Sequence, residues 1–66
     1  MDLQQEIKQR RKALKLSQVD LAEMSGVSIS TVKDIERGKG NPSYATIKKI
    51  VDILGMEFQL KIRTSF

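Results

Sequence analysis

The sequence predicts a small all-α domain of about four to five helices, followed by a short C-terminal β-strand. Aliphatic residues recur at helical spacing along most of the chain, and serine and glycine residues stand where helices would begin and end. The last stretch, "MEFQLKIR", instead alternates apolar and polar residues, as a half-buried strand does. With 66 residues the chain has room for one small domain.

The composition excludes several classes of function. The chain contains no Cys and no His, which rules out disulfides, Cys/His zinc sites, thiol nucleophiles and imidazole general bases. We therefore expect no enzyme activity, no metal and no cofactor. No apolar run approaches the roughly 18 residues of a membrane span, and the N-terminus is too polar for a secretory signal. A cytoplasmic protein without a membrane partner is the resulting expectation.

The charge has an uneven distribution. Twelve basic residues against eight acidic ones give a net charge of +4, and the basic residues gather in segments 8–15 and 33–49. The segment 17–27 between them carries only acidic charges, Asp20 and Glu23. A basic face would suit a polyanion such as nucleic acid, whereas a generic solvated surface that serves solubility is the alternative.

The first expected helix places Leu3, Ile7 and Leu14 on one stripe, with Arg11 in the slot between the last two. A charge on an inward stripe is unusual. Ser17 is the expected N-cap of a second helix, because it precedes Asp20 at the spacing of a capping box. The helix would run through Leu21, Ala22 and Met24 to Gly26.

Ser28 can cap a third helix, which Gly38 would end in a left-handed conformation. Its inward stripe would be Val32, Ile35 and Glu36. Ser43 can cap a fourth helix, which Gly55 would stop, with inward residues Tyr44, Ile47, Ile50, Val51 and Leu54.

The alternating tail has no partner strand elsewhere in the chain. A lone strand leaves its backbone groups unpaired and its apolar face exposed. It must therefore be disordered, lie against the helices, or pair with a second molecule. Its apolar residues are Met56, Phe58, Leu60 and Ile62.

The segment from Gln18 to Arg37 has the features of a helix-turn-helix. Ala22 leaves room for two helices that cross steeply, and Gly26 supplies the backbone conformation of a tight turn. The face of the second helix that points outward would then carry Ile29, Ser30, Lys33, Asp34 and Arg37.

The run "LSQVDLAEMSGVSISTVKDIERGKGNPSYATIKKIVDILG" closely resembles the lambda-repressor-like, or XRE-type, helix-turn-helix domain of phage repressors, Cro proteins and many small bacterial regulators. The elements S-Q-x-x-L-A, S-G-V-S, T-V-x-x-I-E-x-G and N-P-S occur in the family's order. The resemblance implies a DNA-binding transcriptional regulator whose helix from Ser28 to Arg37 enters the major groove of double-stranded DNA. Ser25 departs from the family, because phage repressors often carry an aliphatic residue there.

The family's roles can be carried over by position. Gln18 resembles the glutamine that binds phosphate at the start of the second helix. The positions that match base-facing residues are Ser28, Ile29, Ser30, Lys33 and Asp34, and those that match backbone-gripping residues are Thr31, Arg37, Lys39, Asn41 and Ser43. Ser28 could instead be only a helix cap, and Lys39 and Asn41 only loop residues. The resemblance also implies a buried structural ion pair between Arg11 and Glu36.

The tail resembles that of HipB-type and Y4mF-type antitoxins, in which two C-terminal strands pair across a dimer axis. This implies a DNA-binding domain at 1–55 and a dimerisation strand at 56–66, with Met56, Phe58, Leu60 and Ile62 at the interface. Such a homodimer would repress transcription from a palindromic operator and, as an antitoxin, its own operon. The alternative function is a protein-interaction adaptor that holds a toxin, with DNA binding secondary.

Overall fold

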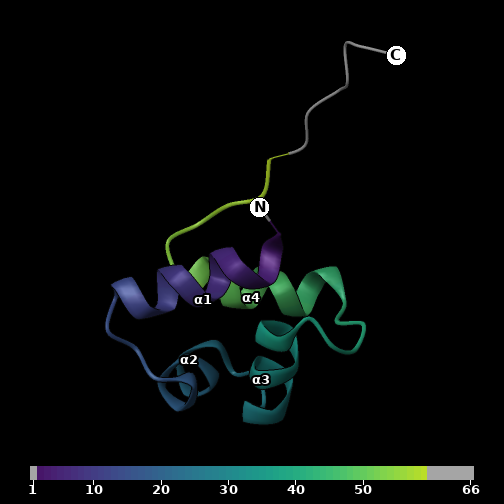
Figure 1. Cartoon of the computed structure of the whole chain (residues 1–66), viewed down its shortest axis with the longest axis horizontal. Coiled ribbons are helices and arrows are strands. Elements are labelled where there is room, and N and C mark those ends of the chain that lie inside the picture. Colours follow the sequence, from purple (N-terminus) through teal and green to yellow (C-terminus); the bar gives the residue numbers. More distant parts are fainter. Residues whose placement is uncertain (1, 60–66) are drawn as a thin grey trace.

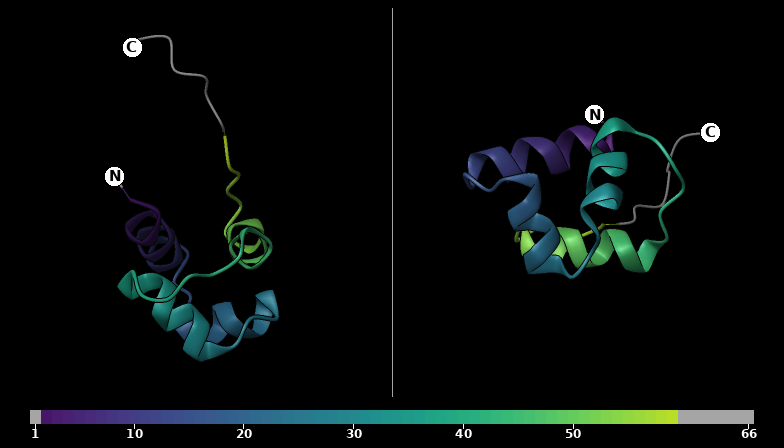
Figure 2. Two further views of the ribbon diagram at one scale, coloured as in Figure 1. Left: turned by 90° about the vertical axis from the view of Figure 1, so that its right-hand side faces the viewer. Right: turned by 90° about the horizontal axis from the view of Figure 1, so that it is seen from below.

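The computed structural model describes residues 2–59. Its helices are α1 (Leu3–Ala13), α2 (Gln18–Ser25), α3 (Ile29–Arg37) and α4 (Tyr44–Ile53), labelled in Figure 1. Seen from below in Figure 2, α1 and α4 lie on two sides of the molecule, and α2 and α3 cross the space between them. The predicted all-α fold is therefore confirmed.

The helices begin where the sequence predicts because polar side chains cap them. The Ser17 hydroxyl accepts a hydrogen bond from the backbone N–H of Asp20 at 2.9 Å, and the Asp20 carboxylate accepts one from the N–H of Ser17 at 2.9 Å. Ser28 and Ser43 cap α3 and α4 by accepting from the N–H three residues further on. Each cap satisfies a backbone donor that the helix itself leaves unpaired.

Two glycines end the helices of the helix-turn-helix. Gly26, with φ 73°, ends α2 in the left-handed conformation and turns the chain toward α3. Gly38, with φ 72°, ends α3 in the same way, and a Cβ at this position would lie 2.9 Å from the Nε2 atom of Gln4. A larger residue at Gly38 would therefore suffer backbone strain, and the end of the Gln4 side chain would have to move aside.

Residues from all four helices and from two connecting positions form the core, which consists of Ile7, Leu21, Ala22, Val27, Val32, Ile35, Ile47, Ile50, Val51 and Leu54. Three residues expected on inward stripes lie outside it. Leu3, Leu14 and Tyr44 are 36%, 41% and 65% exposed, so their assignment to inward stripes was wrong. Leu3 and Tyr44 are the first residues of α1 and α4, and Leu14 follows the last turn of α1, so all three lie at helix ends.

The tail leaves α4 on the side of the molecule opposite α2 and α3 (Figure 1). Met56 packs partly buried against the core, and the ring of Phe58 lies 5.4 Å from that of Tyr44. Residues 56–59 form no strand within the part of the chain that the structure describes. Leu60 and Ile62, which belong to the expected strand, lie outside the described residues.

Candidate nucleic-acid interface

The helix-turn-helix presents one face of α3 away from the core. Val32, Ile35 and Glu36 point inward and are buried. Ser30, Lys33 and Arg37, which lie on the rest of the α3 surface, are exposed. In the left view of Figure 2, α2 and α3 lie together below α1 and α4, so the lower side of α3 is not covered by another helix.

Ile29 and Asp34, which were also predicted to face bases, are only half-exposed. Ile29 packs partly against the core, which leaves part of its side chain for any contact with DNA. The carboxylate of Asp34 accepts a hydrogen bond from Arg37 Nη2 at 2.5 Å, in an ion pair whose side chains are 45% and 58% exposed respectively. Such an exposed pair contributes little to stability.

The serines predicted to contact DNA also have structural roles. Ser28 Oγ accepts from the N–H of Thr31 and donates to Thr31 Oγ1 at 2.8 Å. Ser43 Oγ accepts from the N–H of Thr46, and the two hydroxyls of this pair lie 3.0 Å apart. Both serines are exposed, and Ser28 Oγ also lies 3.3 Å from Ser30 Oγ, so each cap hydroxyl already has partners within the domain.

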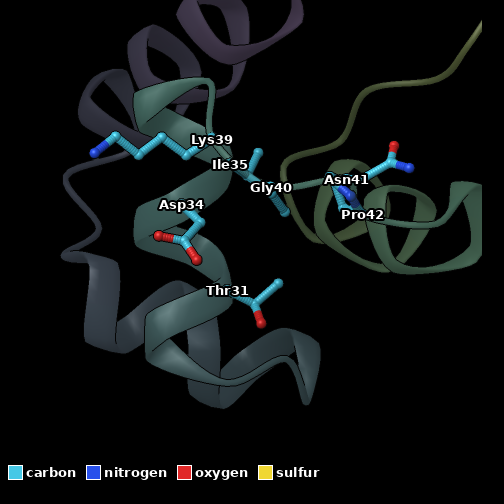
Figure 3. Close-up of a pocket in the computed structure, with 7 residues that line it drawn as sticks. All are labelled: Thr31, Asp34, Ile35, Lys39, Gly40, Asn41 and Pro42. Carbon is cyan, nitrogen blue, oxygen red and sulfur yellow. The ribbon is translucent and has the colours of Figure 1, made fainter.

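A hollow of about 220 Å³ lies between α3 and the loop that follows it (Figure 3). Helix α3 contributes Thr31, Asp34 and Ile35, and the loop contributes Lys39, Gly40, Asn41 and Pro42. The hollow therefore brings together four predicted DNA contacts, Thr31, Asp34, Lys39 and Asn41. Ser43 and Gln18 lie outside it.

Arg11 and Glu36 form the buried ion pair that the sequence predicts. Arg11 Nε donates to Glu36 Oε2 at 2.7 Å and Arg11 Nη2 to Oε1 at 2.9 Å, while Nη1 donates to the carbonyl of Leu16 at 2.8 Å. The hydrogen bond to Glu36 raises the pKa of Arg11. Burial alone would raise the pKa of Glu36, but the bonds from Arg11 and Gln18 and the positive charges of Arg11 and Lys8 together lower it.

The Gln18 bond to this pair was not anticipated. Gln18 Nε2 donates to Glu36 Oε1 at 3.2 Å, which links the first residue of α2 to the last turn of α3. No spacing in the sequence indicates this contact, because the two residues are brought together only by the crossing of the helices.

Comparisons with known proteins agree with this geometry. Residues 7–61 match the model of the helix-turn-helix family. The chain is 44% identical over 57 residues to the "Immunity repressor protein" of Bacillus phage phi105, covering 86% of this chain and 40% of the relative. It is 41% identical over 56 residues to the "Uncharacterized HTH-type transcriptional regulator RghRB" of Bacillus subtilis (strain 168), covering 83% and 40% respectively. The chain thus spans well under half the length of either relative.

Proposed function

The chain belongs to the helix-turn-helix family, and from this membership we propose that it binds double-stranded DNA in a sequence-specific manner and represses transcription. The observation that carries the proposal is the exposed row of Ser30, Lys33 and Arg37 on α3, the second helix of the motif. An α-helix of this kind fits the major groove of B-DNA. The names of the two relatives, a repressor and a transcriptional regulator, support the same function.

The proposed contacts are of two kinds: contacts to bases, which specify the sequence, and contacts to phosphates, which position the protein on the DNA. Lys33 can donate to guanine O6 and N7, and Ser30 can bond to the edge of more than one base. The phosphate backbone would be held by the residues that match backbone-gripping positions of the family, Thr31, Arg37, Lys39, Asn41 and Ser43. These contacts fix the register of α3 without reading sequence. The net charge of +4 favours association with the phosphates.

We further propose that the protein acts as a homodimer joined by the strand at 56–63. Residues 56–59 lie on the side opposite α2 and α3 (Figure 1), so pairing through a strand that starts there would leave both copies of α3 uncovered. A twofold arrangement with recognition helices about 34 Å apart would require a palindromic operator with half-sites one DNA turn apart. The division into a DNA-binding part at 1–55 and a dimerisation tail at 56–66 belongs to the same proposal.

The antitoxin function is a less supported alternative. No contact among residues 2–59 favours a toxin over DNA, and the matched relatives are not named as antitoxins. Salt dependence separates the two functions. Each phosphate contact makes log K fall with log salt by about 0.9, whereas an apolar protein interface would show little such dependence.

Selection of bound duplexes from a random DNA pool tests the proposed function. We expect an enriched palindromic consensus that the protein binds at least about a thousandfold more tightly than a scrambled duplex. Enrichment of no sequence above the starting pool would contradict sequence-specific binding. Enrichment of a single non-palindromic half-site would retain DNA binding but contradict the dimer.

A further inference from the structure

The hydrogen bond from Gln18 to Glu36 determines which way the side-chain amide of Gln18 is oriented. In general, the oxygen and nitrogen of such an amide are interchangeable unless a neighbour distinguishes them. An ionised carboxylate only accepts hydrogen bonds, so the NH2 group of Gln18 must face Glu36 Oε1, 3.2 Å away. Gln18 Oε1 and the second N–H are then directed away from the carboxylate.

Glu36 itself has little freedom to move. Its side chain is 2% exposed, and both of its oxygens accept hydrogen bonds from Arg11, at 2.7 and 2.9 Å. Gln18 is half-buried and lies next to the cap of α2. A partly exposed, rotamer-rich side chain is thus held by a rigid, buried acceptor.

We propose that Glu36 is a positioning residue for DNA binding, which holds the Gln18 amide so that its second N–H is presented to a DNA phosphate. This inference rests on the proposed DNA binding and adds a role to the ion pair beyond stability. Fixing a flexible side chain before association reduces the ordering cost of the contact. Loss of Glu36 should therefore weaken DNA binding even in a protein that remains fully folded.

A mutant cycle on DNA affinity separates positioning from stability. The double variant Arg11→Met/Glu36→Leu replaces the ion pair with apolar side chains, leaves the net charge unchanged and removes the acceptor for Gln18. Gln18→Ala removes the contact from the other side, and the triple variant combines both changes. The control Lys48→Gln/Asp52→Asn removes an exposed ion pair on α4, with the same zero change in net charge.

The expected result on the wild-type consensus duplex is non-additive. A hydrogen bond to a charged group is worth enough that Gln18→Ala should weaken binding about tenfold. The double variant should lose a smaller factor of a few-fold, because Gln18 is still present but no longer held in place. The triple variant should bind no more weakly than Gln18→Ala, and the control should bind like wild type. Wild-type affinity in a folded double variant, or a triple variant that loses the product of both factors, would overturn the proposal.

A second measurement uses the unaltered protein and needs no DNA. In an NMR titration the side-chain amide resonances of Gln18 should shift as Glu36 becomes protonated in acid, while those of the exposed Gln9 stay constant. If Gln18 shows no shift across the protonation of Glu36, the two residues are not coupled and the proposal is overturned, whether or not the double variant folds. A wild-type protein that shows this shift but binds no DNA would instead contradict the proposed function.

Discussion

The guanidinium of Arg11 and the carboxylate of Glu36 are joined by two hydrogen bonds of 2.7 and 2.9 Å, in an ion pair whose side chains are 9% and 2% exposed. The pair connects α1 to α3, and the third donor of Arg11 holds the carbonyl of Leu16 in the turn that leads to α2. Within residues 2–59 no buried side-chain nitrogen or oxygen lacks a hydrogen-bond partner. The pair is therefore fully satisfied, and removal of one member leaves a buried charge.

Arg11→Ala should reduce the free energy of unfolding by about 3–5 kcal/mol, because it leaves Glu36 buried without its partner. Chemical denaturation with matched m-values measures the loss. The double variant Arg11→Met/Glu36→Leu should recover much of it, since apolar residues of similar size need no partner. A melting temperature of Arg11→Ala within a degree or two of wild type would show that the pair contributes little.

Acid should destabilise the protein through Glu36. Its pKa in the folded state is lowered from the ordinary value of 4.5. A lowered folded pKa contributes stability that is complete above the unfolded pKa and disappears as pH falls through the folded pKa. The free energy of unfolding should thus decline below about pH 4.5, and more steeply in wild type than in Arg11→Met/Glu36→Leu. If the free energy of unfolding depends equally on pH in the two proteins, Glu36 is not the cause of the acid sensitivity.

Asp34 should limit the affinity of the protein for arbitrary DNA, because its carboxylate pairs with Arg37 and lines the hollow. We expect Asp34→Asn to raise affinity for unselected duplexes severalfold and to relax preference at one operator position. The matched control is Asp52→Asn, which makes the same change in net charge on α4. An equal gain in both variants would assign the effect to net charge alone.

The dimer proposal predicts that a chain ending at Gln59 is monomeric at micromolar concentration. This truncation keeps the contacts of Met56 and Phe58 described above and removes the rest of the expected strand. A sheet of only two strands is marginally stable, so shortening the strand of each protomer should abolish association. Light scattering that still reports a dimer would place the interface elsewhere.

The sequence predicted the helix boundaries well because caps are local. Ser17, Ser28 and Gly38 act through neighbours within a few residues, so their roles can be read from spacing. Packing at helix ends could not be read in this way. Periodicity placed Leu14 and Tyr44 inside, but it does not show where a helix leaves the core, and both are exposed.

The site was predictable to a similar degree. The exposure of Lys33 on α3 follows from the inward stripe of its helix, which the sequence shows. The half-burial of Ile29 and the bond from Gln18 to Glu36 depend on how the helices cross. Such long-range contacts have no signature in residue spacing.

The central claim is that α3 reads base sequence while its surroundings hold the backbone. The direct measurement is the affinity of Lys33→Ala and Lys39→Ala for a panel of single-base variants of the selected operator. Lys33→Ala should lose about 1–3 kcal/mol on the operator and lose preference at one or two positions. Lys39→Ala should weaken every duplex alike and flatten the salt slope by about one unit. If Lys33→Ala also weakens every variant equally, Lys33 holds the backbone and α3 does not read sequence through it.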